Sequence, residues 1–107
     1  MQCSFPVAII NTHFWFIGTV CEFKIGDGTG GSELYLGKKS SEHECILACE
    51  LKKETDHTIN GVTVPVEHGG TPSCYCERIM KTRNNKRGWK SCFLTRKTYF
   101  FTSCSLH

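Results

Sequence analysis

Hydrophobic and polar residues alternate along this chain in short runs that predict many strands and one helix. Residues 14–25, FWFIGTVCEFKI, are rich in aromatic and β-branched residues and predict one or two strands that end at the glycine-rich GDGTGG. Further short strands are predicted for SELYLG, GVTVPV, CYCERIM, WKSCFLT and KTYFFTS. Pro65 has no backbone N–H, so we expect it to place GVTVPV at an edge of the sheet or to end that strand.

The only helix that the sequence predicts covers SEHECILACELKKE, residues 41–54. Ser41 followed three residues later by Glu44 fits a capping box, and the segment lacks glycine, proline and valine. At about 3.6 residues per turn, Cys45 and Cys49 share one face with Ala48, and this face should point to the core. The pattern predicts an α+β fold, a small disulfide-rich domain in which one helix packs on a mostly antiparallel β-sheet.

The cysteine content bounds the class of protein. The chain has 107 residues, enough for one domain with a modest core, and it contains eight cysteines. An even number of cysteines at this density is typical of a disulfide scaffold in a short secreted protein. In a reducing compartment so many thiols would be explained only if they held metal. Composition therefore predicts a secreted, extracellular protein with disulfide bonds.

The first 20 residues form an apolar N-terminal segment that is interrupted by proline and polar residues. The segment is too short and too broken for a membrane-spanning helix, so we expect no membrane span. No Lys or Arg precedes its apolar run, which extends from Phe5 to Val20, and Gly18 and Val20 make a poor cleavage site before Cys21. We interpret residues 1–20 as a degenerate signal peptide or a first strand, and we expect residues 21–107 to form a single domain.

Cys45 and Cys49 match Cys74 and Cys76 in spacing. Helical residues four apart lie about 5 to 6 Å apart at Cβ, and strand residues two apart share a face at roughly 6.6 Å. A helix that crosses this strand is therefore suited to two adjacent disulfides, with Tyr75 on the opposite face of the sheet. Each disulfide would close a loop of about 25 to 32 residues and contribute roughly 3 to 4 kcal/mol to the free energy of unfolding. The spacing leaves open which helix cysteine bonds to which strand cysteine.

Zinc binding and redox catalysis are the alternatives for these four cysteines. Structural zinc sites take ligand pairs from knuckles on turns, whereas C-x-C on a strand directs its sulfur atoms apart. A four-cysteine zinc site would also leave the other four cysteines without a role, and the chain has no C-x-x-C motif. We therefore predict disulfides and no metal ligands.

The order of Cys21, ECILAC, INGVTV, SCYCE and WKSCFL resembles the PAN/apple class of extracellular modules over about residues 20–94. Those modules place a helix with C-x3-C against an antiparallel sheet, and their disulfides are nested. The resemblance implies three disulfides, Cys21–Cys92, Cys45–Cys76 and Cys49–Cys74. The chain departs from the family pattern because TINGVTV has no cysteine and SCYCE has two. Cys3 and Cys104 lie outside the module and pair with each other, bridge to another chain or stay free.

Motifs for catalysis are missing from the sequence. GDGTGG satisfies G-x-G-x-x-G, but SELYLG follows it instead of a helix, so a flexible hairpin turn is the better interpretation. The five histidines are scattered without metal-ligand spacing, and neither G-x-S-x-G nor H-E-x-x-H occurs. A Cys/His nucleophile needs a free thiolate, and the even cysteine count argues against one. We predict that the protein is not an enzyme and needs no cofactor.

Basic residues gather toward the C-terminus. The net charge is +3, although residues 1–77 contain all ten acidic residues and only five basic ones. The candidate ligand-binding residues for an anionic glycan are Arg78, Lys81, Arg83, Lys86, Arg87, Trp89 and Lys90. Such a cluster attracts sulfated or carboxylated glycans by forces that weaken with salt, while the simpler interpretation is a solvated hairpin tip. For an extracellular protein we expect an anionic glycan as the partner of this segment and no nucleic acid.

These features predict a secreted, non-enzymatic interaction module that binds an extracellular protein or a carbohydrate. One alternative is a small secreted effector, such as a toxin or protease inhibitor, that acts through the basic loop or through YFF at residues 99–101. Another alternative is a zinc-binding intracellular module. The sequence indicates neither the identity of the ligand nor the oligomeric state.

Overall fold

The structure, a computed structural model, describes residues 8–10 and 13–101 of the chain, and side chains from residue 18 to residue 96. Contacts divide the chain into two compact units. Residues 21–95 form the larger unit, and the described residues before and after them form the smaller one. The last strand pairs with the N-terminal segment. A single domain of residues 21–107 stays a prediction.

The smaller unit is a three-stranded sheet. Its strands are β1 (Ala8–Ile10), β2 (His13–Val20) and β10 (Thr95–Phe101), in the order β1-β2-β10. Strands are thus present in the segment that we interpreted as a degenerate signal peptide or a first strand. Cys3, Cys104 and the side chains of residues 99–101 lie outside the described part, so the predictions for them stay predictions.

The larger unit contains a five-stranded antiparallel sheet in the order β3-β9-β6-β7-β5. These strands are β3 (Lys24–Ile25), β9 (Trp89–Phe93), β6 (Ile59–Pro65), β7 (Ser73–Arg78) and β5 (Ser32–Lys38). A separate two-stranded ladder joins β4 (Gly28–Thr29) to β8 (Thr82–Arg83). The predicted α+β fold, a small disulfide-rich domain with a helix and antiparallel strands, is confirmed.

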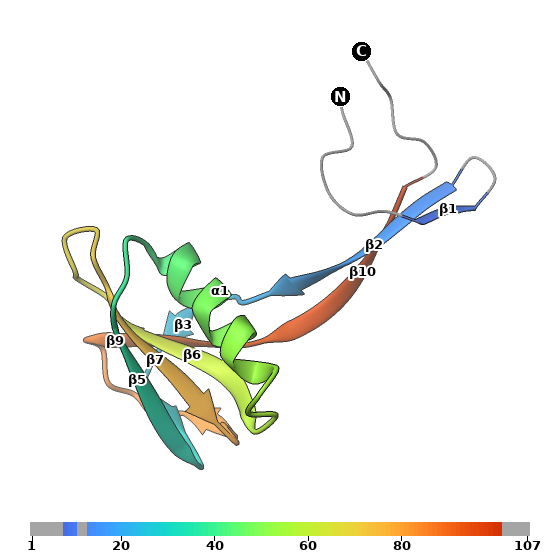
Figure 1. The fold of residues 1–107 in the computed structure, drawn as a ribbon. Helices are drawn as coiled ribbons and strands as arrows, with labels where there is room; N and C mark the ends of the chain where they lie inside the picture. Colours follow the sequence, from blue (N-terminus) through green and yellow to red (C-terminus); the bar gives the residue numbers. More distant parts are fainter. Residues whose placement is uncertain (1–7, 11–12, 102–107) are drawn as a thin grey trace. The chain divides into compact units, whose positions relative to one another are not determined.

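The helix α1 (Glu42–Lys53) covers one face of the five-stranded sheet (Figure 1). The hydroxyl of Ser41 accepts a hydrogen bond of 3.0 Å from the backbone N–H of Glu44, which caps the helix as the sequence predicts. Cys45 and Cys49 lie on the inner face of the helix and are fully buried. No helix among the described residues is long and apolar enough to cross a membrane.

The hydrophobic core lies between α1 and the sheet. Cys76, Val62 and Cys92 stand side by side on β7, β6 and β9, and all three are fully buried. Pro65 is the last residue of β6, so it ends the strand. The alternative that Pro65 places this strand at an edge is wrong, since β6 lies between β9 and β7. Pro65 comes after the last pairing of β6 with β7, at Thr63, so its missing N–H does not interrupt that pairing.

Candidate functional site

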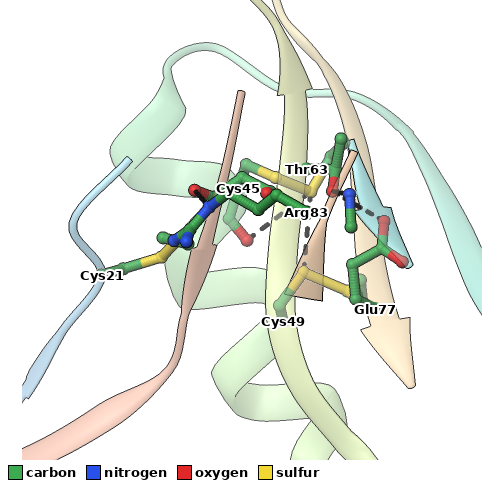
Figure 2. Close-up of a disulfide and its surroundings, with 11 residues drawn as sticks. Cys21, Cys45, Cys49, Thr63, Glu77 and Arg83 are labelled. Carbon is green, nitrogen blue, oxygen red and sulfur yellow. Dashed lines mark hydrogen bonds between the residues drawn. A yellow bond between two sulfur atoms is a disulfide. The ribbon is translucent and has the colours of Figure 1, made fainter. Parts of the chain in front are cut away.

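Three disulfides tie the larger unit together, two of them between α1 and β7 (Figure 2). The bond Cys21–Cys92 is present as the resemblance implies, with its Cα atoms 5.1 Å apart. The other four cysteines form Cys45–Cys74 and Cys49–Cys76, with Cα separations of 5.4 and 5.5 Å.

The implied pairs Cys45–Cys76 and Cys49–Cys74 are therefore wrong. Nested pairs require the helix and the strand to run in opposite senses where they cross, whereas the observed pairs require the same sense. Three of these sulfur atoms lie within 4.8 Å of one another, but each one is held in a disulfide and offers no thiolate to a metal.

The face of the sheet opposite α1 carries three aromatic side chains in contact. Tyr75 alternates with the two buried cysteines of β7 and points away from the helix, as predicted. Its ring centroid lies 4.9 Å from that of Tyr35 on β5 and 5.6 Å from that of Trp89 on β9. Tyr35 is 52% exposed, and Tyr75 and Trp89 are partly exposed. We call Tyr35, Tyr75 and Trp89 the aromatic surface.

The β4–β8 ladder covers the neighbouring part of the same face. The backbone N–H of Gly28 lies 3.4 Å from the Thr63 hydroxyl, to which it donates a hydrogen bond. A Cβ at Gly28 would lie only 2.9 Å from the Glu77 side chain, so glycine is what lets β4 approach this closely. The segment GDGTGG thus includes a short strand over the sheet instead of a flexible hairpin turn. The ladder leaves the aromatic surface open beside it.

Glu77, which lies beneath this ladder, belongs to a cluster of three carboxyl groups. Glu77 is 4% exposed, and its Oε2 accepts a hydrogen bond of 2.6 Å from the Thr63 hydroxyl (Figure 2). One carboxyl oxygen from each of Glu77, Glu33 and Asp27 lies within 4.8 Å of the other two. Burial, the hydrogen bond with Glu33 and the charges of Glu33 and Asp27 raise the pKa of Glu77 to about 8, against the opposing effect of Thr63. Glu77 is therefore largely protonated at neutral pH.

The predicted basic cluster does not form one free surface. Arg78 donates from Nε to Asp56 at 2.7 Å, and Lys90 forms an ion pair with Glu42 of α1 at 2.8 Å. Arg83 donates to the backbone carbonyl of Ser91 and lies over the ring of Phe93. These three cations are therefore engaged within the chain. Lys90 faces the helix while Trp89 faces the other side, because neighbouring strand residues point in opposite directions.

The acidic partners show the effect of these ion pairs. Hydrogen bonds from Arg78 and Thr58 lower the pKa of Asp56 to about 2. Burial disfavours the charged form of Glu42, but hydrogen bonds from Lys90 and His68 outweigh it and lower the pKa of this carboxyl. Arg78 and Lys90 thus form ion pairs within the fold, and these ion pairs occupy the charges that a ligand would need.

Lys86 and Arg87 remain exposed in a tight turn before Trp89. The turn is held by hydrogen bonds from the Trp89 N–H to the Lys86 carbonyl at 3.3 Å and from the Val66 N–H to the Gly88 carbonyl at 3.0 Å. Within the described part of the chain, neither cation nor the exposed Lys81 has an acidic partner within 4.0 Å. Two free positive charges therefore lie next in sequence to the aromatic surface.

The sequence interpretation singled out Trp89 but missed Tyr35 and the carboxyl cluster. The sequence did indicate that Glu77 lies on the same face as Tyr75, because the two residues are two positions apart on one strand. The approach of Asp27 depends on how β4 crosses the sheet, which no local pattern contains.

Comparisons with known proteins give no relative. No family model matches the chain, and no curated protein or solved structure was found to be similar to it.

Proposed function

We propose that this protein is a secreted, non-enzymatic interaction module of PAN/apple-like architecture that binds an anionic glycan through the aromatic surface. The observation that carries the proposal is the continuous contact of Tyr35, Tyr75 and Trp89 on the sheet face that α1 leaves uncovered. Three disulfides support a module that works outside the cell, because such bonds persist in oxidising compartments.

Aromatic rings suit a sugar because the C–H groups on one side of a pyranose form an apolar patch that packs on a ring face. Tyrosine and tryptophan also have few rotatable bonds, so ordering them on binding costs little conformational entropy. Here the rings stand on strands of one sheet, and Cys45–Cys74 and Cys49–Cys76 fix β7, the strand of Tyr75, to the helix on the opposite side. The surface is thus formed before the ligand arrives.

Charge favours an anionic glycan over a neutral one. Lys86 and Arg87 are exposed beside Trp89, and a sulfate or carboxylate on a sugar that stacks there would find both cations. This attraction weakens as salt rises, because exposed charges are screened over about 10 Å at 0.1 M salt.

The test is retention on heparin together with calorimetric titration of a heparin oligosaccharide. We expect Trp89→Ala and Tyr35→Ala each to weaken binding by about tenfold, equivalent to about 1.4 kcal/mol. Lys86→Ala/Arg87→Ala should elute at lower salt. The matched controls are Lys52→Ala/Lys53→Ala, which removes the same charge from the helix, and Leu51→Ala, which truncates a side chain that is 68% exposed on the helix. Both controls should bind as the wild type does.

Two outcomes would overturn the proposal. One is a wild-type protein that does not bind heparin at low salt, and the other is equal loss of binding in the helix controls. A count of free thiols in the native protein without reductant tests the extracellular placement. Several reactive thiols released together with stoichiometric zinc would favour the zinc-binding module instead.

A further inference from the structure

The carboxyl cluster and the aromatic surface are built on the same two strands. Glu33 stands directly opposite Glu77 in the register of β5 and β7, and the next pair on the same face is Tyr35 opposite Tyr75. Among the described strands, β5 pairs with β7 alone and lies at the edge of its sheet. The position of Tyr35 in the aromatic surface therefore depends on the pairing that Glu33 and Glu77 share.

The groups that face Glu77 set its charge. Asp27 approaches from the segment before β4 and Glu33 from β5, while Thr63 of β6 contributes a neutral hydroxyl. β6 has no charged residue, and α1 packs on the opposite face of the sheet. Arg83 of β8 donates a hydrogen bond to the backbone carbonyl of Ser91. Burial and the two neighbouring carboxylates raise the pKa of Glu77 to about 8.

Protonation decides whether the two strands attract or repel each other at this point. In its neutral form Glu77 has a proton to donate to the carboxylate of Glu33, which has an oxygen within 4.8 Å of an oxygen of Glu77. Loss of that proton to solvent leaves two carboxylates directly opposite each other, with Asp27 as a third negative charge. Like charges in directly opposite positions destabilise strand pairing.

We propose that Glu33 and Glu77 form a pH-sensitive latch, which holds the edge strand β5 against β7 while Glu77 is protonated and loosens the aromatic surface when the proton is lost. The effect on ligand binding rests on the proposed function, since the latch acts on the site where the glycan would bind. The latch itself is a property of the protein without ligand.

The primary test is NMR of the ligand-free protein between pH 6 and 9. The ring signals of Tyr35 and Tyr75 should shift or broaden with a midpoint near pH 8. In Glu77→Gln, whose side-chain amide can donate to Glu33 and has no proton to lose, this transition should disappear. Glu33→Gln should move the midpoint to lower pH, and the exposed Glu22→Gln should leave it unchanged. Tyrosine signals that do not respond to pH, or a transition that persists in Glu77→Gln, would overturn the latch.

Binding supplies the second readout. The affinity for a heparin oligosaccharide should fall about tenfold from pH 6.5 to pH 9.0 in the wild type and stay constant in Glu77→Gln. Binding that is independent of pH in the wild type would count against the latch and leave the proposed function standing. Conversely, the tyrosine transition without any heparin binding would support the latch and refute the proposed function.

Discussion

Glu33 and Glu77 lie directly opposite each other on neighbouring antiparallel strands, one pair away from Tyr35 and Tyr75 on the same face. Two ionised carboxylates in such a position would weaken the sheet at its edge. The fold tolerates the pair because burial and the neighbouring acids keep a proton on Glu77 at neutral pH. The same two strands thus carry the carboxyl pair and the aromatic pair on one face.

The stability of the protein should fall as the pH rises toward 8. The pKa of Glu77 is about 8 in the folded state and near 4.5 in an unfolded chain, so the folded state binds more protons between these values. Because a pKa difference of one is equivalent to about 1.4 kcal/mol, we expect the free energy of unfolding to fall by on the order of 3 kcal/mol between pH 5 and pH 8.5. Urea denaturation in this range would measure the loss. Glu77→Gln should be nearly insensitive to pH here, and an equally steep decline in that variant would show that another group is responsible.

The disulfide pairs should be Cys45–Cys74 and Cys49–Cys76 in the isolated protein. Chymotryptic cleavage after Leu47 and Tyr75, without reductant, separates the two cysteines of each element from each other. Mass spectrometry of the linked peptides would then report the pairing directly. Finding Cys45 linked to Cys76 would contradict the structure.

Removal of one of these bridges should leave the other in place. The loop closed by Cys49 and Cys76 spans 27 residues, so we expect Cys49→Ala/Cys76→Ala to lower the free energy of unfolding by about 3 kcal/mol. Cys49→Ala alone is the matched comparison, because it removes the same bond and leaves Cys76 as a buried thiol. Denaturation under non-reducing conditions measures both. A loss below about 1 kcal/mol would show that the bridge adds little to the native helix–sheet contact.

The sequence predicted those features that depend on neighbours in the chain. Ser41 and Glu44 marked the start of the helix, and alternation along SCYCE placed Tyr75 away from the cysteines. The pairing of Cys45 and Cys49 was out of reach from spacing alone, because both pairings fit four-residue and two-residue spacings equally well. The sense in which the helix crosses the strand decides between them, and that is a tertiary property. The basic segment was predicted to form one cluster. Neighbouring side chains of a strand point to opposite faces, so the sequence already implied that Trp89 and Lys90 lie on different sides of the sheet.

Ile79 is strained, and its replacement by glycine should stabilise the protein. Its φ of 51° lies in the left-handed region, which a β-branched side chain disfavours, and its side chain is 53% exposed. Relief of this strain, partly offset by the greater freedom of glycine in the unfolded chain, should raise the free energy of unfolding by about 0.5 to 1 kcal/mol. Ile25 is equally exposed at 53% and is not among the residues with positive φ, so Ile25→Gly is the matched control and should be destabilising. A thermal melt in which both variants lose stability equally would argue against strain at Ile79.

Arg78 should matter for acid stability and not for glycan binding. Its guanidinium donates to Asp56 at 2.7 Å, and with Thr58 it lowers the pKa of Asp56 from 3.8 to about 2. A group whose pKa is lower in the folded state stabilises the protein above its unfolded pKa, so this contribution is present above pH 3.8 and is lost as the pH falls toward 2. Asp56→Asn should therefore be less stable than the wild type at pH 6, and the difference should shrink by pH 2 in urea titrations. Arg78→Ala should behave in the same way while its heparin elution stays close to that of the wild type, in contrast to Lys86→Ala/Arg87→Ala. A large drop in heparin retention on changing Arg78 alone would mean that the ligand recruits this arginine away from Asp56, and the ligand site would then extend beyond the aromatic surface to the end of β7.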